Sequence, residues 1–262
     1  MPLNIIKIGG NVIDNPTFLA QFLKEFAALS QPKALVHGGG KIATQIATKL
    51  GVETLMVEGR RITDQAMLDV VMMVYGGLVN KQIVVKLQAE KCNAIGLTGA
   101  DAGVILAKKR PVKTIDYGFV GDIEKVDNLF INSLLSQNIT PVFAPLTYDA
   151  TGSMLNTNAD TQASAVAVSM AALMPTQLVY CFEKKGVLSN PDDDNSVIKT
   201  MTPASYETLK TVGAIHSGMI PKLDNAFNAL RNGVQTVIIC HADELSKAVS
   251  EGTAGTKLVL EA

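Results

Sequence analysis

The sequence has almost no net charge and few cysteines. Its 23 lysines and arginines nearly balance 24 aspartates and glutamates over 262 residues. A protein that binds nucleic acid or an anionic membrane through phosphate contacts would need a clear basic excess or a basic stripe. Cys92, Cys181 and Cys240 show no CxxC spacing and lie in apolar surroundings, which indicates buried, reduced thiols of a cytosolic protein.

Long apolar segments are also missing. The longest apolar stretch, 163–174, is too short to cross a bilayer, and no basic segment followed by an apolar one opens the chain. We therefore expect a soluble, cytoplasmic protein without a membrane partner. Hydrophobic residues make up 47% of the chain, and its length allows one large α/β domain or two fused lobes with a substantial core.

Short apolar runs alternate with helical patterns along the chain. The apolar runs lie at 3–8, 33–37, 94–99, 140–146, 177–182, 236–241 and 257–260. Their continuous apolarity is typical of strands buried on both faces, as in a parallel sheet. The helical patterns lie at about 15–26, 40–50, 64–91, 128–137, 158–173, 218–232 and 242–249. This alternation predicts an α/β fold, a three-layer αβα sandwich around a mainly parallel open sheet.

Two features bear on domain organisation and assembly. The long helix predicted at 64–91 has apolar residues on more than one face, which fits a central core helix or a helix that also packs on a second subunit. A composition shift near 174–177 and the acidic loop 191–195 predict an N-terminal lobe of residues 1–174 and a C-terminal lobe of residues 175–262. The acidic loop lacks the spacing of a calcium-binding loop and is interpreted as a solvated turn.

Three glycines and a lysine, at 38–41, directly follow a predicted strand. This segment lacks the spacer and the hydroxyl residue of a Walker A loop, and the sequence has no GxSxG elbow to accompany an esterase oxyanion hole. A tight turn commonly needs only one glycine. Three favour a site where backbone N–H groups at a helix N-terminus face an anion. Lys41 is expected on the helix surface.

Lys7 interrupts the first apolar run, just before the pair Gly9 and Gly10. A lysine inside a central strand must be paired or reach a ligand, because burying its charge alone is costly. The alternative is an edge-strand lysine, which the four flanking apolar residues and the following glycines disfavour. Two glycine loops beside this lysine predict an anion-binding cleft at the C-terminal ends of the strands.

Two predicted helix starts carry polar groups that capping does not fully explain. Asn158 is a good N-cap and Asp160 complements the helix dipole, but capping leaves Asn156 unexplained. Lys222 lies near the positive end of the helix that Pro221 opens, which is unfavourable unless an anion faces it. A lysine that points to solvent is equally compatible with this segment.

Arg61 lies just before the predicted long helix. An arginine there can hold a carboxylate through two hydrogen bonds, although a surface position is an equal alternative. His37, His216 and Cys181 have no companions that would form a catalytic triad. We interpret these three as structural or supporting groups.

Nine segments in order resemble the acetylglutamate kinases of the amino acid kinase superfamily: IIKIGGN, VHGGGK, EGRRITD, VYGGLVNKQIV, GLTGADAG, GFVGDIEKVD, TPVFAPL, NTNADTQASAVA and GMIPKLDNA. Each motif alone is weak, but the ordered set is specific. The resemblance implies the amino acid kinase fold and ATP-dependent phosphorylation of the side-chain carboxylate of N-acetyl-L-glutamate, a step of arginine biosynthesis. It also implies that Mg²⁺ arrives with the nucleotide, without a protein metal site.

The resemblance also implies roles for individual residues. Lys7 and Lys222 would stabilise the transferring phosphoryl group, and Asp160 would orient both lysines. Backbone donors to phosphate and to the reacting end of the substrate would come from two glycine pairs, Gly9, Gly10, Gly39 and Gly40.

The remaining implied roles concern the two substrates. Arg61 and Asn156 would hold the α-carboxylate of the acceptor. The nucleotide would lie on the lobe after residue 175, at Glu183, Gly186, Ser217, Gly218 and Met219. The segment 181–188 departs from the family, because Glu183 or Lys184 stands where a turn usually contains aspartate and the turn is one residue longer.

The resemblance bears on assembly as well. Arginine-inhibited members carry an extra N-terminal helix, whereas this chain enters its first strand at Leu3. We therefore expect a homodimer, formed through the helix near 64–91, that is insensitive to arginine.

Three alternatives stay open. N-succinyl-L-glutamate is a possible acceptor in place of the acetyl compound. A kinase acting on carbamate, aspartate or another amino acid is disfavoured, because RRITD and NTNAD follow the acylglutamate pattern. A non-catalytic sensor with the same fold would be indicated by loss of Lys7, Lys222 or Asp160, and all three are present.

Overall fold

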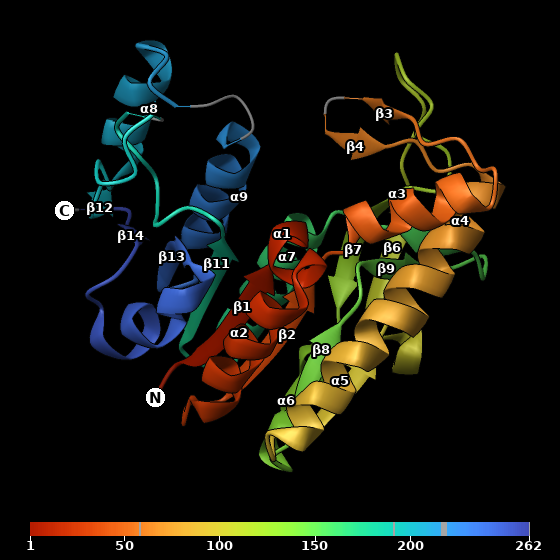
Figure 1. Cartoon of the computed structure of the whole chain (residues 1–262), viewed down its shortest axis with the longest axis horizontal. Coiled ribbons are helices and arrows are strands. Elements are labelled where there is room, and N and C mark those ends of the chain that lie inside the picture. The colour runs from red at the N-terminus through yellow and green to blue at the C-terminus, as the bar shows by residue number, and fades with distance from the viewer. Residues whose placement is uncertain (58, 191, 216–218, 262) are drawn as a thin grey trace.

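An eight-stranded sheet forms the middle of three layers in the computed structural model, which describes residues 1–57, 59–190, 192–215 and 219–261 (Figure 1). The strand order is β12-β14-β13-β11-β1-β2-β8-β5. All neighbours pair in parallel except β13 with β14. The predicted α/β sandwich around a mainly parallel sheet is confirmed. The strands are β1 (Leu3–Ile8), β2 (Lys33–His37), β5 (Ala94–Leu97), β8 (Thr140–Phe143), β11 (Thr176–Phe182), β12 (Thr200–Met201), β13 (Thr236–His241) and β14 (Thr256–Leu258).

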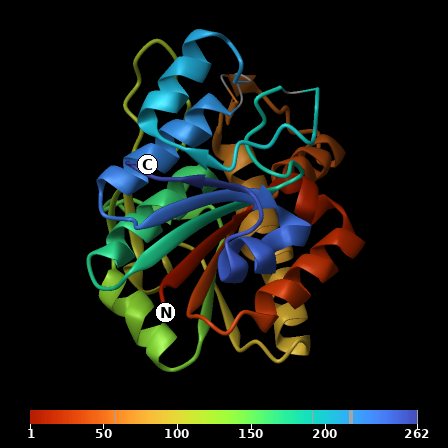
Figure 2. The same cartoon turned by 90° about the vertical axis from the view of Figure 1, so that its left-hand side faces the viewer.

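Helices cover both faces of this sheet, and a separate hydrophobic cluster fills each interface (Figure 2). One cluster is covered by α1 (Gly10–Asp14), α2 (Pro16–Ala28), α3 (Gly40–Lys49), α4 (Gln65–Val71), η1 (Met72–Val79), α5 (Asn80–Ala89), η3 (Ala242–Glu244) and η4 (Lys247–Glu251). The other is covered by α6 (Asn128–Ser136), α7 (Ala159–Ala171), α8 (Pro203–Thr211) and α9 (Ile220–Arg231). The expected helix at 242–249 is therefore two short non-α turns, and α1 and α8 add to the predicted set.

Strand β1 lies between β11 and β2, so Lys7 belongs to a central strand as predicted. Side chains alternate between the two faces of a strand. Leu3 and Ile5 pack into the cluster under α7 and α9, whereas Ile6 and Ile8 pack into the cluster on the opposite face. Lys7 shares the face of Leu3 and Ile5 and therefore points toward α7 and α9.

A second sheet was missed by the sequence patterns. Its order is β10-β9-β6-β7, with β6 (Ile105–Lys109), β7 (Gly121–Val126), β9 (Leu146–Tyr148) and β10 (Met154–Asn156). The strand expected at 140–146 is divided, because β8 ends at Phe143 and β9 begins at Leu146. Strands β6 and β7 contain exposed charged residues and so lack the continuous apolarity used to find the others. A hairpin of β3 (Met56–Val57) and β4 (Arg60–Arg61) and a 3-10 turn, η2 (Asp101–Gly103), complete the chain.

The predicted long helix runs continuously over Gln65–Ala89 but has a π-helical middle, η1. By length and composition alone this 25-residue helix, with a mean hydropathy of 1.4, could cross a membrane. The search for uninterrupted apolar runs, which found 163–174 as the longest, did not detect it. The same test is passed by core helices of soluble proteins, and 44% of its apolar window is buried in the protein. Its α5 part contacts α2, β5 and β8, as a core helix does.

A glycine links the second sheet to the segment that follows the β3–β4 hairpin. Gly118 has a φ of +70° and forms a bridge with Thr63. A Cβ atom on Gly118 would lie 2.2 Å from the Thr63 carbonyl oxygen, whereas one on Gly152, with a φ of +88°, would meet nothing within 4 Å. A substitution at either glycine would strain the backbone, but only a substitution at Gly118 would also cause a steric clash.

We predict that Gly118→Ala destabilises the protein more than Gly152→Ala does. Both substitutions impose a left-handed backbone on alanine, which costs about 1–2 kcal/mol. Only Gly118→Ala also forces a clash, which adds roughly 1–3 kcal/mol. Urea unfolding of the two variants measures the difference, and equal losses of unfolding free energy would contradict the assigned clash.

Candidate functional site

Two adjoining cavities open where strands of the large sheet end. The larger is a cleft of about 1020 Å³ and the smaller is a pocket of about 190 Å³. Both are lined by Gly40, Met56 and Arg61, so they meet at the start of α3 and the β3–β4 hairpin. Gly9 and Gly10 line the cleft as well. The structure thus brings both glycine loops to one site at the strand ends, where ligands of open α/β sheets bind.

A carboxylate shared by two lysines lies at this site. Lys7 Nζ is 2.8 Å from Asp160 Oδ1, and Lys222 Nζ is 3.0 Å from Asp160 Oδ2. Lys7 comes from the end of β1, Asp160 from the first turn of α7 and Lys222 from the first turn of α9. Both lysines line the large cleft, and Lys7 is only 8% exposed. The interpretation of Lys222 as a solvent-facing lysine is therefore wrong.

Burial and the opposite charges shift the pKa values of this cluster. Burial by itself would raise the pKa of Asp160, but the charges and hydrogen bonds of Lys7 and Lys222 outweigh it and hold that pKa well below its usual value. Burial lowers the pKa of Lys7, and the neighbouring Lys222 charge adds to this, while Asp160 opposes it. Asp160 is thus ionised at neutral pH.

The two glycine loops differ in backbone conformation and in the hydrogen bonds of their N–H groups. Gly39 has a φ of +142°, which L side chains rarely adopt, and a Cβ atom there would lie 3.3 Å from the Tyr75 ring, a tight contact. Gly40 begins α3, and Gly10 begins α1. Gly9 donates its N–H to the Cys181 carbonyl oxygen at 3.3 Å, which extends the β1–β11 ladder. This differs from the expectation that the Gly9 amide faces phosphate.

Arg61 and Asn156 both line the small pocket. Arg61 is 8% exposed, which rules out the surface alternative. Its Nη2 donates to the Gly40 carbonyl oxygen at 3.0 Å and to Thr44 Oγ1 at 2.9 Å. Asn156 is buried, and its Nδ2 donates to Thr63 Oγ1 at 3.0 Å. Asn158 caps α7 by accepting from the Thr161 N–H, as predicted.

The part of the cleft after residue 175 is mainly apolar. Glu183, Gly186 and Met219 line it, as the sequence predicts, whereas Ser217 and Gly218 lie outside the described residues, as does His216. Apolar side chains join them: Phe182, Val187, Leu188, Ala214 and Ile215. Gly186 also has a packing reason, since a Cβ atom there would lie 2.6 Å from Thr256 Oγ1.

Sequence patterns missed several residues that line the cleft, among them Asn11, Lys41, Thr44 and Gln45. Only Lys41 carried a signal, its place directly after the glycine triplet. His37 is structural, as interpreted: its Nδ1 donates to the Gly38 carbonyl oxygen at 2.7 Å, and Asn80 Nδ2 donates to its Nε2 at 3.1 Å. Burial lowers the pKa of His37 to about 4, so the ring is neutral at neutral pH.

Comparisons with known proteins agree with this arrangement. The sequence matches the amino acid kinase family over residues 2–241. It is 60% identical to an acetylglutamate kinase from Cytophaga hutchinsonii over 98% of each chain, and 55% identical to one from Phocaeicola vulgatus over 96% of each chain. The fold is shared with N-acetylglutamate synthase from Neisseria gonorrhoeae, at a TM-score of 0.83 and 22% identity, where this chain spans 60% of the longer protein. The chain therefore belongs to the amino acid kinase family, alongside the acetylglutamate kinases.

Proposed function

We propose that this chain is an ATP-dependent phosphotransferase that phosphorylates the side-chain carboxylate of N-acetyl-L-glutamate, a step of arginine biosynthesis in the cytoplasm. The observation that carries the proposal is the pair of lysines on Asp160, which line the large cleft close to its junction with the small pocket. High identity to acetylglutamate kinases over the whole chain supports the same activity.

The acceptor explains why the site needs cations more than a catalytic base. A side-chain carboxylate with a pKa near 4.3 is already ionised at neutral pH and is itself the nucleophile. Its approach to an anionic phosphoryl group is opposed by roughly 4 kcal/mol for one like-charge pair at ~4 Å and an effective dielectric constant of ~20. Cancelling that repulsion is worth about three powers of ten in rate.

Each residue of the site has a part in this chemistry. Lys7 and Lys222 offset the charge that develops on the transferring group, while Asp160 fixes the positions of both lysines. Amides at the starts of α1 and α3, at Gly10 and Gly40, add donors to the same region. Arg61 and Asn156 hold the α-carboxylate of the acceptor in the small pocket.

We assign the two lobes to the two substrates. Residues 1–174 supply the small pocket and bind the acceptor, and residues 175–262 supply the apolar wall of the cleft for the nucleotide base. Among the described residues, no group of three acidic, histidine or cysteine side chains is placed to hold a metal, and Asp160 is occupied by lysines. Mg²⁺ is accordingly proposed to enter on the phosphates of ATP, and no step is assigned to it.

A second acceptor, N-succinyl-L-glutamate, is favoured by one observation. Arg60 and Arg61 both line the small pocket, which has a volume of about 190 Å³. A succinyl group carries a carboxylate that an acetyl group lacks, and arginine is well suited to bind carboxylates. The acyl group is therefore decided by comparing the two substrates.

We predict that the protein with Mg·ATP forms an acyl phosphate from N-acetyl- or N-succinyl-L-glutamate, which hydroxylamine traps as a hydroxamate. Lys222→Ala should lower kcat by about 10²–10³-fold with little change in acceptor KM, because its charge acts on the transferring group. Lys24→Ala, an exposed lysine on α2, serves as the matched control and should keep full activity.

Two outcomes would contradict this assignment. Absence of hydroxamate from both acceptors would overturn the reaction and favour the non-catalytic sensor. A rise in KM alone for Lys222→Ala would overturn the transition-state role of that lysine. The ratio of the two kcat/KM values for the wild-type protein identifies the acyl group.

The lowered pKa of Lys7 predicts an alkaline limb in the pH profile of kcat/KM. Since this pKa lies below its ordinary value of 10.5, the neutral form accumulates at lower pH than for a free lysine. The required positive charge is then lost as the pH rises, and kcat/KM already falls at pH values below 10.5. Lys7→Arg, which keeps its charge at these pH values, should lose this limb. An unchanged limb in Lys7→Arg would assign it to another group.

We further propose a homodimer formed through the helix Gln65–Ala89. Four of its large apolar side chains are exposed in the single chain, namely Met72, Met73, Leu78 and Val85. Exposed apolar groups on a helix are suited to packing against a second copy of the same chain. Light scattering should give twice the 27.8 kDa mass of one chain, and Val85→Lys should shift it toward one chain. A monomeric wild-type mass would overturn the dimer.

A further inference from the structure

Lys41 lies on the face of α3 that borders the site. Gly40, Lys41, Thr44 and Gln45 all line the large cleft, whereas Ala43 and Ala47 are buried in the core on the other side of the helix. The side chain of Lys41 is 64% exposed, so in the sequence it is indistinguishable from an ordinary surface lysine. Its exposure is toward the cleft.

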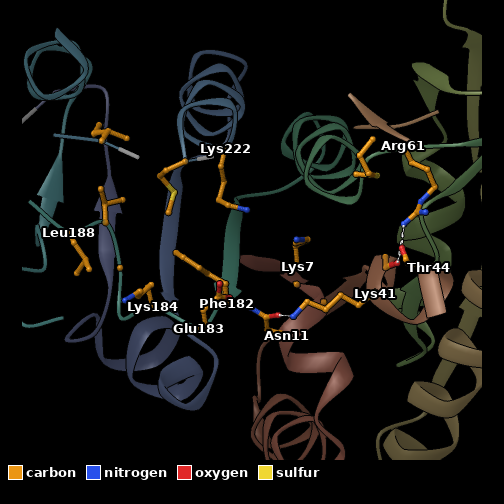
Figure 3. Close-up of a pocket in the computed structure, with 18 of the residues that line it drawn as sticks. Lys7, Asn11, Lys41, Thr44, Arg61, Phe182, Glu183, Lys184, Leu188 and Lys222 are labelled. Atoms are coloured by element: carbon orange, nitrogen blue, oxygen red, sulfur yellow. Dashed lines mark hydrogen bonds between the residues drawn. The ribbon is translucent and has the colours of Figure 1, made fainter. Parts of the chain in front are cut away.

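Two residues of α1 contact this lysine. Lys41 Nζ donates a hydrogen bond to Asn11 Oδ1, and it is 3.8 Å from Asp14 Oδ2. Figure 3 shows the Lys41 side chain extended toward Asn11, on the same side of the cleft as Lys7. The carboxylate oxygens of Asp14 are buried and accept no hydrogen bond from any residue that the structure describes. Lys41 is thus held at the lining of the cleft by one neutral amide and one more distant anion.

The position of Lys41 in its helix resembles that of Lys222. Each lysine lies in the first turn of a helix, where a positive charge is unfavourable to the helix dipole. Lys222 is compensated by Asp160 at 3.0 Å, whereas Lys41 has a carboxylate only at 3.8 Å. An ammonium group has three donors, so Lys41 retains capacity for an anion that enters the cleft.

The charges around Asp160 leave room for such a cation. Lys7, Lys222 and Asp160 together contribute one net positive charge, since two lysines share one carboxylate. A nucleoside triphosphate keeps several negative charges even with one divalent ion bound. The terminal phosphoryl group has to reach the junction of the two cavities, at Gly40, and Lys41 directly follows Gly40.

We propose that Lys41 is a third cation of the phosphate site, which binds the terminal phosphoryl group of the nucleoside triphosphate. Asn11 and Asp14 are positioning residues that keep the lysine in the cleft before the nucleotide arrives. This proposal rests on the proposed function for the identity of the nucleotide, but it assigns a ligand contact to a residue for which the resemblance implies no role.

Calorimetric titration without any acceptor tests this contact. Lys41→Met should weaken binding of Mg·AMP-PNP by about tenfold, as loss of one charge-assisted hydrogen bond predicts, and leave adenosine affinity within about twofold. Lys49→Met is the matched control, because Lys49 is an exposed lysine of the same helix that does not line the cleft, and its affinities should match wild type. Lys41→Arg should restore most of the AMP-PNP affinity.

Two results would overturn the proposal: unchanged AMP-PNP affinity in Lys41→Met, or equal weakening of AMP-PNP and adenosine. Melting temperatures of all variants confirm that they are folded. The outcome is separable from the proposed function, because the acceptor is absent. Normal Lys41-dependent nucleotide binding together with no hydroxamate would overturn only the reaction, and hydroxamate formation with Lys41-independent binding would overturn only the contact.

Discussion

The site depends on one shared charge, the carboxylate of Asp160 between two lysines. Neither Lys7 nor Asp160 could be buried alone, because an unpaired charge in the interior costs more than folding can offset. Pairing Asp160 with Lys7 and Lys222 brings together the end of β1 and the N-termini of α7 and α9. The N-terminal and C-terminal parts of the chain are thereby joined by electrostatics as well as by the ladder between β1 and β11.

This junction also explains the layering of the molecule around the site. The pleat of β1 sends Lys7 to the face of α7 and α9, while Ile6 and Ile8 pack on the other face. The glycine loops turn the chain at the strand ends, and their small residues keep the space above the lysines open. The helix starts at Gly10 and Gly40 face that space. Strand, turn and helix start thus act as one unit.

Sequence patterns predicted the buried parallel strands and the pairing of Lys7, because continuous apolarity and an isolated buried charge have few physical solutions. They missed β6 and β7, because the charged residues of these strands interrupt the apolar pattern. They also missed the π-helical segment η1, because its residues are of the same types as those of an α-helix. They also placed Lys41 on the surface. A position that lines a cleft and a position on the outer surface are occupied by the same kinds of polar residue. Only the fold shows which of the two a given residue occupies.

Arg61 lines both cavities and also fixes the start of α3. Its Nη2 donates to Gly40 and Thr44, and its Nη1 donates to Thr54 Oγ1 at 3.3 Å. A guanidinium group has five N–H donors in a rigid fork. A carboxylate held by both Nη atoms must therefore share or replace bonds that now fix the start of α3. Under the proposed function, filling the small pocket acts directly on Gly40, the residue that also lines the phosphate cleft.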